Sequence, residues 1–153
     1  MDLLLATYRD LLLSVNTGNN KGKSAVSKPI FLLSVFNAID NGHLNKNEIL
    51  LNSFFLREEF GKMYESENEN KKGYKSSFFI RPLFHLSSSP FYHLIWKQGI
   101  EPPSMSHTPS AKYLRENLLY AKLDDELWDL LQEAENREYL KRCIIDRYLT
   151  KQE

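Results

Sequence analysis

The sequence lacks several features that would restrict its fold and location. Among 153 residues there is one cysteine, Cys143, so an internal disulfide is excluded and a reducing compartment is expected. No apolar run approaches the roughly 20 residues that a membrane-spanning helix needs. Asp2 stands where a signal peptide carries positive charge. We therefore expect a cytoplasmic protein with no membrane partner, folded as a single domain over residues 1–153.

Residues suited to catalysis or metal binding are also scarce. Residues 18–24 superficially resemble a nucleotide-binding phosphate loop, but they lack its spacing and follow a predicted helix, not a strand. The four histidines and single cysteine form no paired zinc motif, and Cys143 lies among apolar residues, as a buried, unreactive thiol would. The acidic residues 124–126 could hold a cation, but helix capping explains them more simply. We expect no enzyme activity, no metal and no cofactor in this chain.

The chain has no net charge, since 20 Lys and Arg balance 20 Asp and Glu, which at first argues against a nucleic-acid partner. The charges are unevenly placed, however. No acid occurs between Asp10 and Asp40 or between Glu69 and Glu101. These two acid-free windows carry eight positive charges, which are Lys21, Lys23, Lys28, Lys71, Lys72, Lys75, Arg81 and Lys97.

The acid-free windows have two interpretations. The glycine-rich loop with Lys21 and Lys23 and the aromatic segment with Arg81 and His85 would form a nucleic-acid interface if they met on one face, because phosphates bind cations and backbone amides. Alternatively, they are a solvated loop and a solvated hairpin with no ligand. The sequence leaves both interpretations open.

Hydrophobic periodicity predicts an α+β, helix-dominated fold with about six helices. Ser27 is a suitable N-cap, Pro29 suits the first turn, and Asn41-Gly42 would end this helix, which is apolar enough to be central to the core. The fourth helix is predicted to include Leu118 and Ala121. The six helices are predicted to start near residue 2, residue 27, Asn52 or Ser53, residue 109, residue 124 and residue 136.

The other segments predict a small antiparallel β element, which would make the fold winged-helix-like. A short strand is predicted over residues 47–51. Residues 78–96 are rich in aromatic side chains and predict either a short helix or strand followed by a strand, or a hairpin, with a turn over 86–91. Residues 65–72 are polar and predict an exposed loop, and the proline-containing residues 101–109 predict a surface linker.

Two short motifs resemble those of a known family. Residues 27–33, Ser-Lys-Pro-Ile-Phe-Leu-Leu, resemble the His-Lys-Pro-x-x-Leu-Leu opening of a helix in sulfur-binding domains. These domains precede the nuclease in McrA-type HNH restriction endonucleases. Residues 81–86 and then Leu94 match the spacing of the family's Tyr-Pro-Phe-Trp-x-Leu and Asp-Gly-x-Trp-x-Leu pattern. Residues 121–127 are similar to related HNH-associated domains, so the resemblance covers nearly the whole chain.

The resemblance implies a DNA-binding domain that reads phosphorothioate, in which sulfur replaces a non-bridging phosphate oxygen. In the family, an apolar cup that contacts the sulfur is built around a proline, which corresponds to Pro82. The basic residue at the start of the family's helix corresponds to Lys28. Ser27 replaces the family's histidine and Arg81 its tyrosine, and Ser89-Pro90 replaces its Asp-Gly turn. Pro82 would equally serve to start a turn.

No His-Asn-His-type motif follows Glu153, so we expect a recognition module whose HNH nuclease domain, if any, lies elsewhere in a parent protein. The expected function is binding of modified double-stranded DNA. The alternative is a protein-interaction or assembly domain without DNA binding, suggested by the acidic C-terminal third and the aromatic residues near Trp96. The predicted DNA-binding residues are Lys21, Lys23, Ser27, Lys28, Arg81, Pro82, His85, Lys112 and Arg115.

Overall fold

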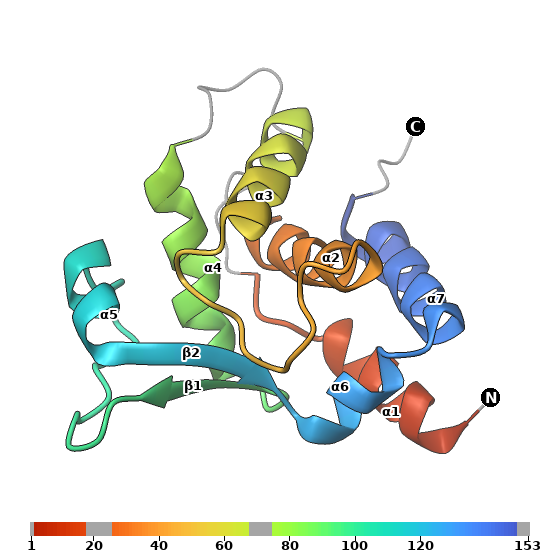
Figure 1. The fold of residues 1–153 in the computed structure, drawn as a ribbon. Coiled ribbons are helices and arrows are strands. Elements are labelled where there is room, and N and C mark those ends of the chain that lie inside the picture. The colour runs from red at the N-terminus through yellow and green to blue at the C-terminus, as the bar shows by residue number, and fades with distance from the viewer. Residues whose placement is uncertain (1, 18–25, 68–74, 150–153) are drawn as a thin grey trace.

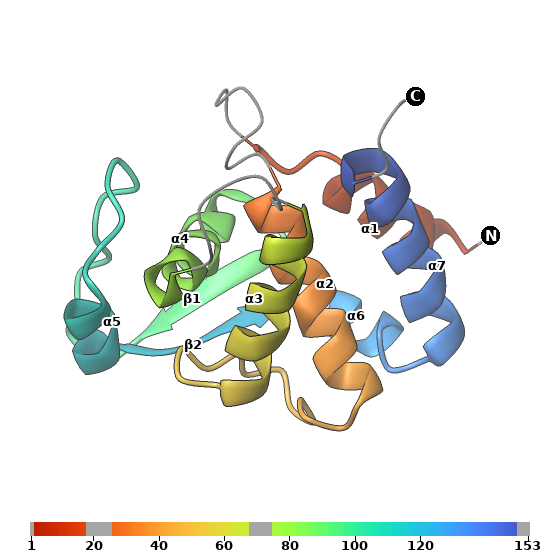
Figure 2. The same cartoon turned by 90° about the horizontal axis from the view of Figure 1, so that it is seen from above.

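The computed structural model describes residues 2–17, 26–67 and 75–149, and in it helices cover one face of a two-stranded sheet (Figure 1, Figure 2). The fold is α+β and helix-dominated, as predicted. Short helical turns η1 (Ser76–Phe79), η2 (Leu86–Ser88) and η3 (Ile145–Leu149) adjoin the main elements. The main elements of the described ranges are α1 (Leu3–Leu12), α2 (Ser27–Asp40), α3 (Phe54–Glu67), α4 (Ile80–His85), β1 (Tyr92–Trp96), α5 (Ala111–Asn117), β2 (Leu118–Leu123), α6 (Asp125–Leu130) and α7 (Ala134–Ile144).

Helix α2 is central to the hydrophobic core, as its apolar sequence predicts. Every residue from Ile30 to Phe36 is buried, and the helix contacts α3, α4 and α7. Its one buried hydroxyl, that of Ser34, donates a 2.9 Å hydrogen bond to the carbonyl of Ile30 and is thereby satisfied. The helix ends at Asp40 with Asn41 as its C-cap, and Gly42 follows with a φ of 75°, a conformation that favours glycine.

Aromatic contacts position the start of α2 beside α4. The Phe31 ring lies 5.3 Å from Phe79, just before α4, and 6.2 Å from Tyr92 on β1. The buried Tyr92 hydroxyl donates a 2.6 Å hydrogen bond to the carbonyl of Leu83 in α4. These contacts hold α2, α4 and β1 together as one packed unit.

Strands β1 and β2 are antiparallel, with Tyr92 opposite Leu123 and a register shift between Ile95 and Trp96. The strand predicted at residues 47–51 is reduced to one bridge, in which Ile49 exchanges hydrogen bonds of 2.7 and 2.9 Å with Ala121. A winged-helix-like arrangement is not confirmed. A long loop and α5 join the two strands, whereas a wing is usually a hairpin.

One prediction about the strands is wrong, and for another the structure decides between two alternatives. Leu118 and Ala121 belong to β2, not to the helix that precedes it. They are three residues apart, so they fit a helical period, but in the structure pairing with β1 decides their conformation. For the aromatic segment, the structure confirms the alternative of a short helix followed by a strand and contradicts the hairpin. The segment forms the short helix α4 and then β1, whose partner strand comes from the distant residues 118–123.

The structure corrects two predicted helix starts, those with Ser27 and Asn136 as the N-cap. Val26, not Ser27, occupies the N-cap of α2, and Glu133, not Asn136, occupies that of α7. The Asn136 amide instead donates a 2.9 Å hydrogen bond to the carbonyl of Leu130. Asp124 is the N-cap of α6, as predicted, but its carboxylate makes no cap hydrogen bond.

The predicted loop over residues 65–72 is partly helical, because α3 continues to Glu67. Residues 68–72 of that prediction lie outside the described residues. The linker predicted over residues 101–109 has no helix or strand, as expected. Within the described ranges, no helix has both the length and the apolar character needed to span a membrane.

Candidate nucleic-acid interface

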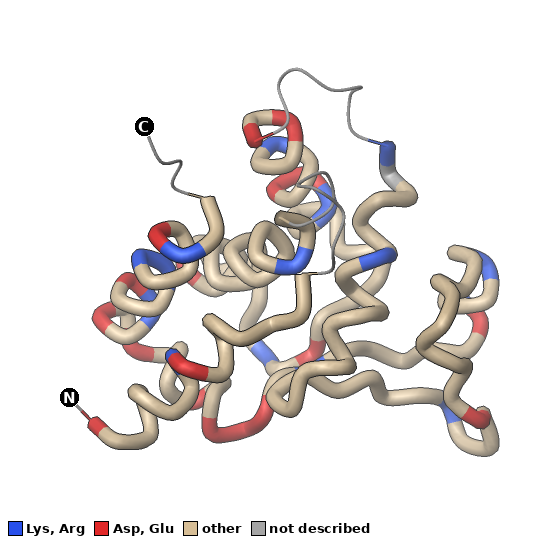
Figure 3. The backbone as a smooth tube through the Cα atoms, turned by 180° about the vertical axis from the view of Figure 1, so that it is seen from behind, with Lys and Arg blue, Asp and Glu red and all other residues tan. Residues whose placement is uncertain are grey.

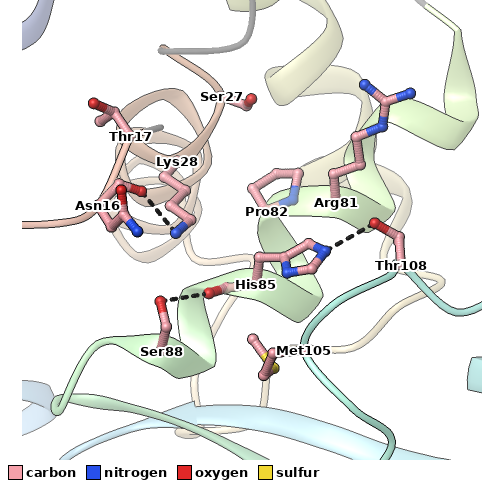
Figure 4. Close-up of a pocket in the computed structure, with 10 residues that line it drawn as sticks. All are labelled: Asn16, Thr17, Ser27, Lys28, Arg81, Pro82, His85, Ser88, Met105 and Thr108. Carbon is pink, nitrogen blue, oxygen red and sulfur yellow. Dashed lines mark hydrogen bonds between the residues drawn. The ribbon is translucent and has the colours of Figure 1, made fainter. Parts of the chain in front are cut away.

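The first turn of α2 and one side of α4 line a pocket with a volume of about 440 Å³, which we call the basic pocket (Figure 4). Five of the predicted DNA-binding residues line it. They come from two acid-free windows that are far apart in the sequence. The described residues that line it are Asn16, Thr17, Ser27, Lys28, Arg81, Pro82, His85, Ser88, Met105 and Thr108.

Helix α4 presents its pocket residues at helical spacing. Arg81, His85 and Ser88 are separated by four and three residues, which places them on one side of the helix and its continuation η2. Pro82 lies in the first turn of α4, where its missing N–H costs no helical hydrogen bond. Pro82 is buried beside the pocket and lies near the start of the helix. Its position is therefore compatible with both predicted roles, as part of an apolar cup and as the start of a turn.

Lys28 is a partly desolvated cation at the positive end of α2. Its ammonium donates a 2.7 Å hydrogen bond to the carbonyl of Asn16. Burial lowers the pKa of Lys28 below its ordinary value, because the charged form loses hydration. The helix dipole also disfavours a cation at this end of a helix. An anion bound nearby would relieve both costs.

His85 is half-buried and lies within 2.8 Å of the Thr108 hydroxyl, measured from Nε2 to Oγ1. Burial lowers the pKa of His85 from its ordinary value of 6.5, and the positive charges of Lys28 and Arg81 lower it further. The imidazole is therefore neutral at neutral pH, and its hydrogen bond connects α4 to the loop that carries Thr108.

Arg81 is exposed, and its guanidinium lies over the ring of Phe78 at 5.2 Å from the centroid. Figure 4 shows Pro82 between Arg81 on one side and Lys28 on the other. A ligand at Pro82 would therefore have cations on both sides.

The pocket has no acidic lining residue among the described ones, so its cations have no carboxylate competing with a ligand. Figure 3 likewise shows Lys or Arg, and no Asp or Glu, on α4 and on the first turn of α2. Hydroxyls and cations would donate hydrogen bonds to phosphate oxygens, and Pro82 and Met105 offer apolar contact.

Sequence reasoning missed half of the pocket lining. Ser88 would have been found by extending the helical spacing of Arg81 and His85 by one turn. The other four residues carry no local signal, because they lie in a loop after α1 and in the linker between β1 and α5. The missed residues are Asn16, Thr17, Ser88, Met105 and Thr108.

Four predicted residues are not among the described lining of the basic pocket. Lys21 and Lys23 lie outside the described residues. Lys112 and Arg115 are exposed on α5 and do not line this pocket. These two predicted DNA-binding residues therefore lie outside the basic pocket.

Other clusters considered from the sequence have structural partners. Asp124 accepts hydrogen bonds of 2.7 Å from Tyr8 and 2.6 Å from His93, which ties α1 to β1. Cys143 is half-buried in α7. Among the described residues, no group of three or more His, Cys, Asp or Glu side chains is placed to hold a metal ion.

The aromatic residues near Trp96 largely pack within the chain. Trp96 is half-buried, with its ring 6.5 Å from Phe84 and 6.3 Å from Tyr113. Most of this cluster is thus used for internal packing, which weakens the basis for a protein-interaction surface there.

Comparison with known proteins does not assign this chain to a family. No model of a known protein family matches this chain, and no curated protein has a matching sequence. The assignment of a function therefore rests on the pocket and on the motifs of the chain.

Proposed function

We propose that this chain is a recognition module for modified double-stranded DNA, related to the sulfur-binding domains of McrA-type HNH restriction endonucleases. The single observation that carries the proposal is the basic pocket, where Lys28, Arg81 and Pro82 come together without an acidic neighbour among the described residues. Cations at this position would hold backbone phosphates.

A phosphorothioate is the modification that the pocket chemistry favours. Sulfur is larger and less well hydrated than oxygen, so apolar surface distinguishes the two atoms. Pro82 borders the pocket but is itself buried, so most of this apolar surface comes from the polarizable thioether of Met105, a residue that is 40% exposed. Lys28 would then neutralise the phosphate charge while Pro82 and Met105 contact the sulfur.

Binding to two otherwise identical duplexes, one plain and one with a single phosphorothioate, tests the proposal by fluorescence anisotropy at several salt concentrations. We expect tighter binding of the sulfur-containing duplex. Arg81→Ala should weaken binding to both duplexes and reduce the slope of log affinity against log salt by about 0.9, the effect of losing one phosphate contact. Arg142→Ala, which removes an exposed cation from α7, is the matched control.

Specificity should depend on the apolar residues. Pro82→Ala and Met105→Ser should each reduce the preference for sulfur more than they reduce overall affinity. Met105 lies in an exposed loop, so its substitution avoids the risk that Pro82→Ala disturbs α4. The intact chain binding neither duplex at low salt would contradict the proposal, and an unchanged preference in both variants would remove the apolar contact from it.

A further inference from the structure

A second pocket, of about 410 Å³, lies next to the basic pocket and shares Thr108 with it. We call it the aromatic pocket. It is formed by the linker after β1 and the first turn of α5. The described residues that line it are Pro103, Ser104, His107, Thr108, Pro109, Ser110 and Tyr113.

The two adjoining pockets differ in chemistry. No Lys, Arg, Asp or Glu is among the described residues lining the aromatic pocket, whereas Lys28 and Arg81 line the basic pocket. Pro103, Pro109 and Tyr113 are each half-buried, so part of their apolar surface is accessible. The hydroxyls of the lining offer a small number of hydrogen-bonding groups around this apolar surface.

The Tyr113 ring is held in place by aromatic packing. It meets Trp96 edge-on with centroids 6.3 Å apart, and Trp96 in turn meets Phe84 at 6.5 Å. Phe84 belongs to α4, the helix that carries the residues of the basic pocket. On the other side, Ser110 caps α5 by accepting a 3.0 Å hydrogen bond from the Tyr113 amide. The ring is therefore positioned before any ligand binds.

We infer that the aromatic pocket receives a nucleobase whose neighbouring phosphate lies in the basic pocket. A nucleotide joins an anionic phosphate to an aromatic base through a sugar, and the two adjoining pockets offer matching cationic and aromatic surfaces in that order. The inference rests on the proposed function. It adds that the recognised DNA has one base displaced from the helix, because a stacked base has no exposed face for Tyr113.

Tyr113 and the displaced base can be tested together with phosphorothioate duplexes. Three duplexes carry, next to the modified linkage, a paired base, a mismatched base or an abasic site, with each side of the linkage taken in turn. We expect the duplex with the mismatched base to bind more tightly than the duplex with the paired base, because less base pairing has to be broken. The abasic duplex should lose the contribution of the base.

Tyr113→Leu should weaken binding of the base-containing duplexes by roughly fivefold to hundredfold, the range for loss of one stacked base. It should leave the abasic duplex unchanged. Tyr113→Phe, which keeps the ring, should resemble the original protein. His107→Ala changes an exposed lining residue with little risk to folding and should also affect only the base-containing duplexes.

Equal weakening of all three duplexes by Tyr113→Leu, or no weakening of any, would overturn the nucleobase inference while leaving the proposed function intact if the sulfur preference remains. A protein that binds none of the duplexes would instead contradict the proposed function itself. Thermal unfolding of each variant separates a loss of binding from a loss of fold.

Discussion

The cations at the two ends of helix α2 differ in whether a carboxylate lies beside them. At its C-terminal end, Asp40 accepts hydrogen bonds from Arg137, at 2.5 Å, and from Lys141, both on α7. At its N-terminal end, Lys28 and Arg81 line a pocket with no acidic residue among the described lining. Cations at the first end connect two helices through a carboxylate, whereas the cations at the second end face no carboxylate among the described lining residues.

The difference follows from helix electrostatics. A helix carries partial negative charge at its C-terminus and partial positive charge at its N-terminus. Arg137 and Lys141 therefore lie at the favourable end, where Asp40 compensates them further. Lys28 lies at the unfavourable end and is desolvated as well, which lowers its pKa. The arrangement at Lys28 costs stability, and proteins commonly accept such a cost where a ligand binds.

The largest effect on stability is expected from Asp40→Ala, which leaves Arg137 and Lys141 without their anion. The side chains of these two cations are only 13% and 16% exposed. We expect unfolding free energy to fall by about 2 kcal/mol, the scale of hydrogen bonds to charged groups. The melting temperature should then drop by about 4 to 8 °C. A drop below about 1 °C would show that this ion cluster does not hold α2 to α7.

The same cluster predicts a loss of stability in acid. Burial raises the pKa of the Asp40 carboxyl, but hydrogen bonds from Lys141 and Arg137 outweigh this and leave the pKa below its ordinary 3.8. Ionised Asp40 thus stabilises the fold above pH 3.8, and this contribution is lost as the pH falls through the lowered pKa. Urea unfolding at several pH values should show this loss in the original protein but not in Asp40→Asn.

Lys28→Met should separate binding from stability at the other end of α2. Methionine keeps an apolar side chain of similar length, and removing a desolvated cation offsets the lost hydrogen bond to Asn16. We expect unfolding free energy to change by less than about 0.5 kcal/mol, a scale typical of helix-dipole effects. Duplex affinity should fall, with the salt slope reduced by about 0.9. A large loss of stability with unchanged binding would show that Lys28, like Arg137 and Lys141, contributes to the fold and not to binding.

The smallest expected effect concerns pH and His85. The folded chain resists protonation of His85, so its neutral form contributes stability above pH 6.5 that declines as the pH falls toward the lowered folded pKa. A phosphate bound in the basic pocket would oppose the charges of Lys28 and Arg81 and raise the pKa of His85, so we expect binding to take up a proton.

Duplex affinity should therefore rise as the pH falls through the range between the free and bound pKa values of His85. The rise is at most about tenfold for each pKa unit that the phosphate adds. His85→Gln should remove this part of the pH dependence, measured by anisotropy at constant salt. An identical pH profile in His85→Gln would show that His85 does not sense the ligand.

Several features of the fold and pocket follow from local sequence. The apolar run of α2 predicts a buried helix, and Asn41-Gly42 predicts its end. A cap at Asn52 or Ser53 predicts the start of α3, and in the structure the Ser53 hydroxyl accepts a 3.3 Å hydrogen bond from the Leu56 amide. These predictions succeed because caps and periodicity depend on residues within a turn or two. The prediction of a helix through Leu118 failed because its pattern fits a strand too, and a distant partner decided between them.

The sequence by itself determined that two acid-free windows exist and that Arg81, Pro82 and His85 lie within five residues of one another. The structure decided that one short helix contains all three. Only the tertiary structure decided that Lys28 lines the same pocket as these three residues. It also decided that Thr108 and Met105 complete the pocket and that Lys112 and Arg115 do not line it. The physical reason is that packing of Phe31, Phe79 and Tyr92 in the core sets how α2 and α4 lie together, and no local pattern records that packing.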